Sequence, residues 1–387
     1  MSRIEDALRA ASIAHSTPGF VAMATWRGEP LFDGAFGSCA MDGATPMSTD
    51  TVFWLASMTK ALTATAAMQL VEQGRVSLDT PLAPIVPELG AAQVVDSFDS
   101  AGAPRLRAPS RAVTLRHLLT HTSGHVYDMW NADFARASAS LGVPSLGTGL
   151  NAALQAPLMA DPGEVWEYGI GIDWAGKVIE AVSGQTLDAY LEDHVLGPLG
   201  MTSTAFVSSP QMTARAAGMT MRAPDGSIVP FDLPMNPSPE FWGGGGGLSG
   251  TAGDYLRFLQ MVLNGGALEG VRGLKAETVA EMVRNQLGDI PIRKLTTAVP
   301  FLTHDLDLAG DAAAHWGLSW QINPQQGPEG RSAGSVAWAG LANTYYWADP
   351  AEQVAGVFMT QLLPFSDPDC LAMFKTFERA VYDEVRR

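Results

Sequence analysis

The chain has 387 residues, 47% hydrophobic and 17% charged, so it can bury a core large enough for one large domain or two smaller ones. Its formal net charge of -16 gives an acidic surface that repels nucleic acid and anionic membranes, and we therefore exclude both as partners. The two cysteines, Cys39 and Cys370, have neither the number nor the spacing of a disulfide framework or a metal site. They are typical of free thiols in a reducing compartment.

The first predicted element is an amphipathic helix over residues 3–15, in which acidic and basic side chains are mixed. This segment lacks the apolar stretch of a signal peptide. No run of about 18 apolar residues occurs in the chain, so we expect no membrane span. A cytoplasmic location is the expectation that follows.

Two strands and a second helix follow in the sequence. The strands are predicted at 20–25 and 30–36, joined by a short turn at 27–29. A helix rich in Ala, Leu, Met and Gln is predicted over 57–73, and Gly74 stands where a C-terminal cap belongs.

The middle of the chain, from about 80 to 235, contains helical patterns broken by Pro and Gly. The clearest helix covers 172–182, and another is predicted behind Thr186, which suits an N-cap. A run of glycines at 243–247 predicts a hinge or a loop that approaches other backbone closely. A helix is predicted again at 254–263.

Strand patterns return near the C-terminus, and a helix with one apolar face ends the chain. The three strands and this helix are predicted at 336–340, 344–348, 354–361 and 370–385.

This order of elements predicts an α+β fold. One antiparallel sheet is built from both chain ends and flanked by helices, and a mainly helical subdomain is inserted between them. We place the sheet domain at 1–95 and 235–387, and the helical subdomain at 96–234. A cleft between the two parts is the natural place for a site.

Two serine motifs compete for the role of nucleophile, and the first is the G-x-S-x-G pattern around Ser332. In α/β-hydrolases this motif needs a strand before the serine and a helix after it. Here a loop precedes Ser332 and a strand pattern follows. The partners of such a serine also follow in the order acid, then histidine, but no histidine occurs after His315. We therefore interpret this motif as an accidental Gly/Ser turn.

The second motif is the S-x-x-K pattern of Ser57 and Lys60. A spacing of three on a helix places both side chains on one face, within contact range. A serine hydroxyl needs a base close by, and lysine can serve when burial or a helix N-terminus lowers its pKa. Ser57 stands at the start of its predicted helix, where free backbone N–H groups can also stabilise an oxyanion.

The alternative interpretation of this pair is a helix N-cap serine with an exposed lysine. The chain has five lysines, and only Lys60 has a serine three positions before it. Its surroundings are apolar, with VFWLA before Ser57 and Ala-Leu after Lys60. A lysine in such surroundings is expected to be buried and perturbed.

These residues resemble a known superfamily. The stretch FWLASMTK (53–60) resembles the first motif of class C β-lactamases, DD-peptidases and family VIII carboxylesterases. The stretch VTLRHLLTHTSG (113–124) is similar to a helix-and-turn signature of the same superfamily, and EVWEYG (164–169) to the segment that carries its catalytic tyrosine. With Trp338-Ala339-Gly340 and the last helix, the resemblance covers nearly the whole chain and implies a β-lactamase-like fold.

The resemblance also implies roles for individual residues. Tyr168 becomes a second base that shares protons with Lys60 and Ser57, and the backbone N–H groups of Ser57 and Leu341 form the oxyanion hole. Lactamases and peptidases carry Tyr-x-Asn where this chain has Ile170 as the third residue, so an amide contact to substrate is missing.

Lactamases and peptidases also carry Lys-Thr-Gly where this chain has the triplet that begins at Trp338 and ends at Gly340. A lysine there binds the carboxylate of the antibiotic, whereas an indole offers one neutral donor. The tryptophan favours uncharged acyl groups, and Trp-x-Gly resembles the family VIII esterases. We therefore expect Ile170, Trp338 and Gly340 to line the substrate site.

The histidines carry no metal signal, because His121 and His125, four apart, have no accompanying Glu or third ligand. We interpret His117 and His121 as structural, and we expect His125 to line the mouth of the cleft. Neither a metal nor a cofactor is expected.

The sequence thus predicts a serine carboxylesterase that hydrolyses small or medium neutral esters through an acyl group on Ser57, with weak β-lactam hydrolysis as a side activity. The first alternative is an acyltransferase that passes the acyl group to an alcohol, because the segment at 173–177 and the C-terminal region look similar to fungal polyketide acyltransferases. The second is a non-catalytic binding or scaffold protein with the same fold.

Overall fold

The computed structural model describes residues 2–41, 43–233, 236, 238–308 and 314–387. Its largest sheet has seven strands in the order β11-β12-β13-β14-β15-β1-β2, each antiparallel to its neighbours. Strand β1 (Gly19–Trp26) pairs with β2 (Glu29–Gly37) on one side and with β15 (Val354–Met359) on the other. The two ends of the chain therefore meet within one sheet, as predicted from the sequence.

The remaining strands of this sheet follow in sequence from its far edge. They are β11 (His315–Trp316), β12 (Gln321–Ile322), β13 (Val336–Gly340) and β14 (Thr344–Asp349). Every residue of β13, β14 and β15 is buried, which explains why these strands are nearly continuous apolar runs.

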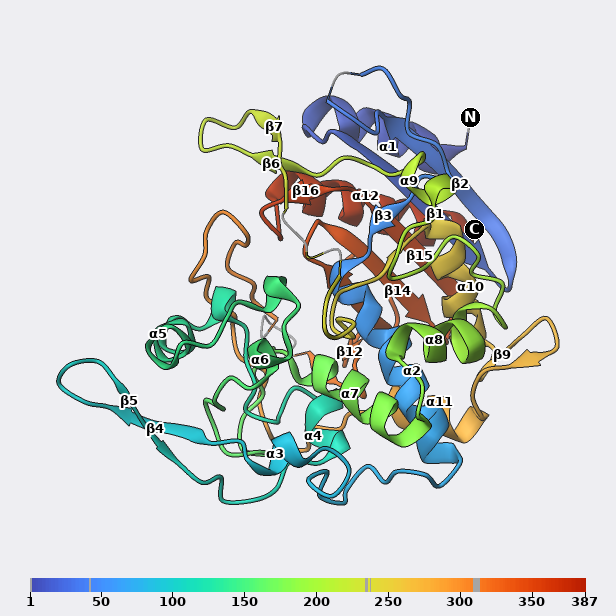
Figure 1. The fold of residues 1–387 in the computed structure, drawn as a ribbon. Helices are drawn as coiled ribbons and strands as arrows, with labels where there is room; N and C mark the ends of the chain where they lie inside the picture. The colour runs from blue at the N-terminus through green and yellow to red at the C-terminus, as the bar shows by residue number, and fades with distance from the viewer. Residues whose placement is uncertain (1, 42, 234–235, 237, 309–313) are drawn as a thin grey trace.

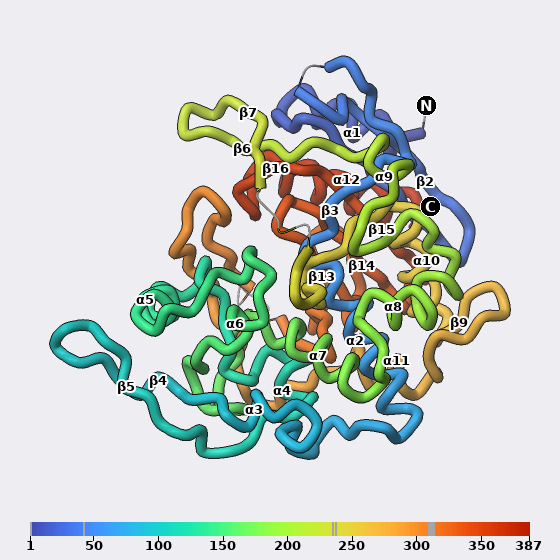
Figure 2. The backbone as a smooth tube through the Cα atoms, viewed as in Figure 1, coloured from blue at the N-terminus to red at the C-terminus, as the bar shows by residue number. Residues whose placement is uncertain are grey.

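Helices cover both faces of the sheet (Figure 1). Alternate side chains of β14 show the two faces, since neighbours on a strand point in opposite directions. Tyr346 packs against Tyr255 of α10 (Ala252–Leu263), whereas Trp347 packs against Phe377 of α12 (Pro368–Val385). Helix α1 (Arg3–Ala14) lies beside α12, and Figure 2 shows both termini on the same side of the molecule.

Helix α2 (Thr59–Glu72) runs through the centre of the molecule. All its residues from Thr59 to Leu70 are buried, so it has no solvent face, as expected of a helix packed on all sides. It packs against α7 (Gly171–Ser183) and α8 (Leu187–Leu191), and the short helix η1 (Ala56–Met58) in front of it contacts β13.

The other elements are short. The helices are α3 (Pro87–Gly90), α4 (Leu115–Leu119), η2 (Asp128–Trp130), α5 (Ala132–Leu141), η3 (Leu146–Thr148), α6 (Asn151–Leu154), η4 (Glu192–Leu196), α9 (Pro210–Thr213) and α11 (Ala276–Met282). The strands are β3 (Phe53–Trp54), β4 (Val94–Phe98), β5 (Pro104–Arg107), β6 (Thr220–Arg222), β7 (Ile228–Pro230), β8 (Ser249–Gly250), β9 (Ala267–Leu268), β10 (Val271–Arg272) and β16 (Leu362–Leu363).

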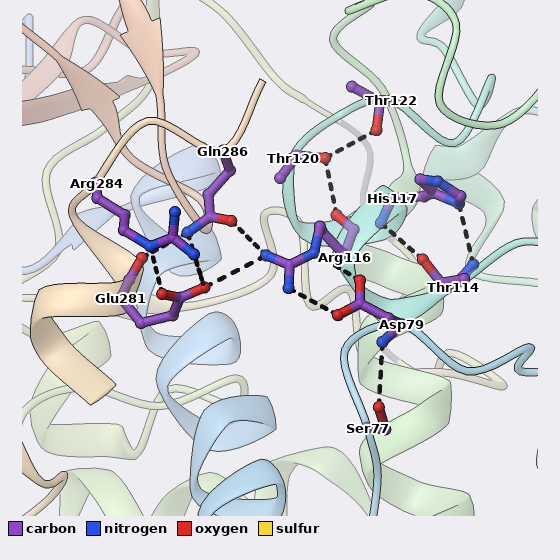
Figure 3. A network of polar contacts seen from close by, with 10 residues as sticks. All are labelled: Ser77, Asp79, Thr114, Arg116, His117, Thr120, Thr122, Glu281, Arg284 and Gln286. Carbon is purple, nitrogen blue, oxygen red and sulfur yellow. Dashed lines mark hydrogen bonds and ion pairs between the residues drawn. The ribbon is translucent and has the colours of Figure 1, made fainter. Parts of the chain in front are cut away.

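Arg116 of α4 ties three separate segments together (Figure 3). Its guanidinium pairs with Asp79 at 2.7 Å and with Glu281 of α11 at 3.4 Å, and it also donates to Gln286. Bidentate pairing with Asp79 is the geometry in which arginine binds a carboxylate most strongly. The network therefore anchors the motif at 113–124 to the loop after α2 and to α11.

The predicted elements agree with the structure, with small differences at their ends. The helix predicted from residue 57 begins one residue earlier, as the 3₁₀ turn η1, and continues as α2. The strand predicted to reach Gln361 ends at Met359, because the Gln361 side chain leaves the sheet to bind the backbone of Trp54. Thr186 occupies the N-cap of α8 but its side chain makes no capping bond.

The domain boundaries at 96 and 234 stay a prediction. Strand β6, inside the range assigned to the helical subdomain, pairs in parallel with β16 near the C-terminus. None of the helices in the described part of the chain has both the length and the hydrophobicity needed to cross a bilayer.

Packing in the middle of the sheet gives a stability test at Gly356 of β15. A Cβ there would come within 2.0 Å of the Trp347 ring. Such overpacking in a fully buried sheet costs about 2 kcal/mol, so Gly356→Ala should lower the free energy of unfolding by about that amount in urea denaturation. The control is Gly253→Ala in α10, where a Cβ meets no atom within 4 Å; it should leave stability unchanged or raise it by about 0.5–1 kcal/mol. Equal stability of the two variants would contradict this packing.

Candidate active site

Ser57 lies in η1, directly before the N-terminus of α2. The preceding residue, Ala56, has a positive φ of 46°, a conformation that costs free energy for a residue with a Cβ. Strained backbone of this kind is concentrated at functional sites, because the surrounding structure must enforce it. The strain is therefore a structural pointer to Ser57 that the sequence does not show.

Lys60 is completely buried one helical turn after Ser57. Its Nζ lies 3.1 Å from Ser57 Oγ, 3.0 Å from the hydroxyl of Tyr127 and 2.6 Å from the carbonyl oxygen of Gly245. Burial lowers the pKa of Lys60 to about 7, and the charge of Asp173 partly opposes this shift. A lysine with this pKa is partly neutral near pH 7 and can accept a proton from Ser57.

Tyr168 lies in the loop before α7, and its hydroxyl accepts a hydrogen bond from the indole N–H of Trp338 at 2.9 Å. Its ring lies 4.8 Å from Lys60 Nζ. Burial raises the pKa of Tyr168, although hydrogen bonds with Ser57 and Trp338 work against the shift. Tyr168 therefore keeps its proton near neutral pH, where it can donate to an oxygen at Ser57.

Tyr127 is one of the residues at this site that the sequence analysis did not identify as partners of Lys60. It lies between α4 and η2, and its hydroxyl is fixed by Lys60 Nζ. Burial raises the pKa of Tyr127 well above its usual value, so it is a neutral phenol. Its only sequence signal is its position three residues after the motif at 113–124, which carries no chemical information.

The glycine run at 243–247 approaches α2 closely. The carbonyls of Gly244, Gly245 and Gly246 accept hydrogen bonds from Thr63, Lys60 and Trp54, respectively. Of the two sequence interpretations, close approach therefore describes this loop.

Gly340 brings β13 against the residues before Ser57. A Cβ at Gly340 would lie 2.3 Å from the carbonyl oxygen of Leu55, so only glycine permits this contact. In the described part of the chain, the backbone N–H groups of Ser57 and of Leu341, the next residue, donate to no other protein group. Two free N–H groups beside the candidate serine are the arrangement that an oxyanion hole requires.

A pocket of about 520 Å³ opens over Ser57. Tyr127, Tyr168, Trp338 and Gly340 also line it, and most of the wall is aromatic or aliphatic. The described residues of this lining include no lysine, arginine or histidine; their charged groups are the carboxyls of Asp128 and Asp173. The volume suits a ligand the size of a small drug, and the lining suits an apolar and uncharged one.

Two residues that the sequence placed at the substrate are elsewhere. His125 is buried with its Nδ1 3.0 Å from Ser123 Oγ, and burial lowers its pKa to about 3, so it is neutral. Ile170 is buried at the start of α7, where its carbonyl accepts the N–H of Asp173. Neither lines the pocket, and His125 packs against Trp174 of α7 instead. The backbone of His125 lies so close to Gly169 that a Cβ at this glycine would clash with it.

The other two histidines of this region have structural contacts. His117 forms a capping box with Thr114 at the start of α4 (Figure 3). His121 is buried against Tyr168, with ring centroids 4.5 Å apart. In the described residues, no group of three or more His, Cys, Asp or Glu side chains is placed to hold a metal ion.

Ser332 lies in a loop that leads into β13, and its N–H donates to Asp349. The neighbouring Arg331 forms an ion pair with buried Glu378 of α12, away from the pocket. A strand follows this serine, so it is not the elbow between strand and helix that its motif would require. Both cysteines, Cys39 and Cys370, are buried and free.

Several known proteins are similar to this chain in both fold and sequence. A family model described as Beta-lactamase matches residues 2–373. Monacolin J acid methylbutanoyltransferase from Aspergillus terreus is 31% identical over 401 residues, 99% of this chain and 96% of that protein. A solved LovD9 mutant of simvastatin synthase from the same organism superposes with a TM-score of 0.83 and 31% identity, over 99% of this chain and 98% of that one.

A lovastatin esterase from Penicillium rubens is also similar, with 30% identity over 351 residues, 87% of this chain and 86% of that protein. The family model, the full-length relatives and the superposed fold agree with one another and with the resemblance found in the sequence motifs. The chain therefore belongs to the Beta-lactamase family, as an acyl-transferring serine enzyme.

Proposed function

We propose that this protein is an acyltransferase that moves a small, neutral acyl group from an activated ester or thioester to an alcohol. The observation that carries the proposal is its full-length similarity to a methylbutanoyltransferase, at 31% identity over 99% of the chain. The site geometry supports it, since an apolar pocket of about 520 Å³ has room for an acceptor beside an acylated Ser57. The carboxylesterase expected from the sequence becomes the second candidate.

The first half of the reaction acylates Ser57. Its Oγ attacks the carbonyl carbon of the donor while the proton passes over 3.1 Å to Lys60 Nζ. The developing oxyanion is bound by the backbone N–H groups of Ser57 and Leu341. When the intermediate collapses, the donor's leaving oxygen or sulfur takes a proton from Tyr168, which is replenished from Lys60.

The second half reverses these steps with a new nucleophile. The acceptor hydroxyl loses its proton to Lys60, directly or through Tyr168, and its oxygen attacks the acyl carbon. Ser57 Oγ leaves and regains a proton, so that all three groups return to their starting states. Trp338 holds the Tyr168 hydroxyl by donating its indole N–H, which leaves the phenolic proton free to point towards the reacting oxygen.

Hydrolysis uses the same acyl-enzyme with water in place of the alcohol. The similarity to a lovastatin esterase favours it as the second candidate. The two activities differ only in whether the acceptor occupies the pocket more effectively than water. An aromatic and aliphatic wall disfavours ordered water and favours an apolar acceptor, which is why we place transfer first.

The nucleophile is tested with Ser57→Ala and Ser332→Ala, using p-nitrophenyl butyrate as donor. Loss of the Ser57 hydroxyl removes the covalent step, so the rate should fall by at least about 10³-fold. Ser332→Ala, which changes a surface loop, should stay within about twofold of the wild type. Activity that survives in Ser57→Ala and vanishes in Ser332→Ala would overturn the assignment.

Transfer is separated from hydrolysis by adding alcohols of increasing size and apolarity. With a good acceptor, the new ester should form at the expense of butyrate, as measured by mass spectrometry of both products. Butyrate as the sole product with every alcohol, and with thioester donors as well, would instead establish a hydrolase.

The charge of the lining predicts selectivity between substrates. A donor whose acyl chain ends in a carboxylate should react about tenfold more slowly than its neutral methyl ester, because the described lining offers two carboxyls and no cation. Asp128→Asn should narrow this gap by accelerating the charged donor alone, as measured by kcat/KM. Equal rates for both donors in the wild type would contradict the proposed preference.

A further inference from the structure

Asp173 is a buried carboxyl group behind the proposed base. It lies in the first turn of α7 and is 2% exposed. Its Oδ1 accepts the backbone N–H of Gly245 at 2.9 Å, whereas its Oδ2 has no hydrogen-bond partner among the described residues. Burying a carboxyl group with one oxygen unsatisfied costs free energy, so the position calls for a functional reason.

Gly245 connects this carboxyl group to Lys60. While its N–H donates to Asp173, its carbonyl oxygen accepts from Lys60 Nζ at 2.6 Å. A Cβ at Gly245 would lie 2.6 Å from Asp173 Oδ2 and 3.0 Å from the Tyr127 hydroxyl. The Cα of Gly245 therefore faces both the acid and the tyrosine, with no room for a side chain, while its carbonyl oxygen faces the lysine.

We propose that Asp173 is a positioning residue that holds the Gly245 carbonyl against Lys60 and supplies the negative charge that acts on this lysine. The inference rests on the proposed function, in which Lys60 accepts the proton of Ser57. It adds a fourth side chain, on α7, to the set formed by Ser57, Lys60 and Tyr168.

The other titratable groups around Lys60 are neutral near pH 7. They are Tyr127, Tyr168 and His121. Burial raises the pKa of both tyrosines, while burial and the charge of Lys60 lower the pKa of His121. The groups around Asp173 are Lys60 and the same two tyrosines. Burial raises the pKa of Asp173, whereas the charge of Lys60 and the hydrogen bond from the Gly245 N–H lower it. Among the described residues, the ionised form of Asp173 therefore supplies the charge that acts on Lys60.

The sign of the effect follows from the charges. The attraction of Asp173 favours the ammonium form of Lys60 and so raises the pKa that burial lowers, leaving it at about 7. Removal of the negative charge would lower the pKa of Lys60 further. The neutral amine, which is the base, would then appear at a lower pH, and the acidic limb of the rate profile would move in the same direction.

The test measures how fast a fluorophosphonate labels Ser57 as a function of pH, alongside kcat/KM for p-nitrophenyl butyrate. The wild-type labelling rate should rise with a midpoint near pH 7. Asp173→Asn keeps an oxygen for the Gly245 N–H but removes the charge, so its midpoint should fall by about one pH unit with a plateau within a few-fold of wild type. Asp173→Ala also loses the hydrogen bond, and its plateau should fall a further tenfold or so.

The matched control is Glu180→Gln, which removes a carboxylate from the same helix. Glu180 is partly buried, pairs with Lys177 and accepts the backbone N–H of Leu187, and its variant should keep the wild-type midpoint. Gly245→Ala tests the contact from the other side: the new Cβ should displace the carbonyl from Lys60 and lower the plateau about tenfold while Asp173 keeps its charge. Thermal denaturation checks that each variant is folded.

A midpoint in Asp173→Asn that stays at the wild-type pH, or moves upward, would refute the charge effect. Equal plateaus in Asp173→Asn and Asp173→Ala, or an unchanged plateau in Gly245→Ala, would refute the positioning role. Labelling of Ser57 needs no acyl acceptor, so a wild-type protein that is labelled but transfers no acyl group would contradict the proposed function alone.

Discussion

The burial of Lys60 is the constraint on which the rest of the site depends. An ammonium group moved out of water loses its hydration, and the protein must either pair the charge or let the group become neutral. Here α2 is covered on all sides, and Lys60 has no exposed surface. Three oxygens, from Ser57, Tyr127 and Gly245, surround Nζ instead. The same burial that costs stability lowers the pKa of the lysine to about 7, which the proposed role as a base requires.

To surround the Lys60 amine with oxygens, the backbone of neighbouring segments must come so close that a side chain on it would clash. Gly245 supplies its carbonyl to Lys60, and Gly340 allows β13 to lie against the residues that precede Ser57. One glycine thus serves the base and the other the proposed oxyanion hole. The glycine loop comes from the middle of the sequence and β13 from near its end, and both meet at η1 and α2. The site therefore depends on a fold that brings these distant segments together.

The sequence predicted the parts of the site that depend on local spacing. Ser57 and Lys60 are three apart on a helix, and Trp338 belongs to a strand whose pattern is clear. Tyr127 and Asp173 were not predicted as partners of Lys60, because they reach it through tertiary packing from loops and helices distant in sequence. Such tertiary contacts leave no periodic pattern of residue types in the sequence.

His125 and Ile170 show the opposite failure, in which proximity in sequence was mistaken for proximity to the pocket. Both are close in sequence to tyrosines that line the pocket, yet both are buried and neither lines it. Gly169 packs so closely against the backbone of His125 that no side chain fits there, and α7 begins two residues later. Because this segment is not an extended strand, the side chain two positions after Tyr168 does not have to share its face.

Trp338 links the geometry of the site to its choice of substrate. A lysine at this position in related motifs would offer a charge to a carboxylate, but here the single indole donor is already used by Tyr168. The tryptophan therefore orients the phenol and presents only an apolar ring surface to the substrate. The described lining contains no cation, so binding energy must come from apolar contact. In the proposed reaction, this favours the binding of an acyl group and an acceptor that are both uncharged. In the proposed reaction, exclusion of water by that contact favours an alcohol over water at the acylated Ser57.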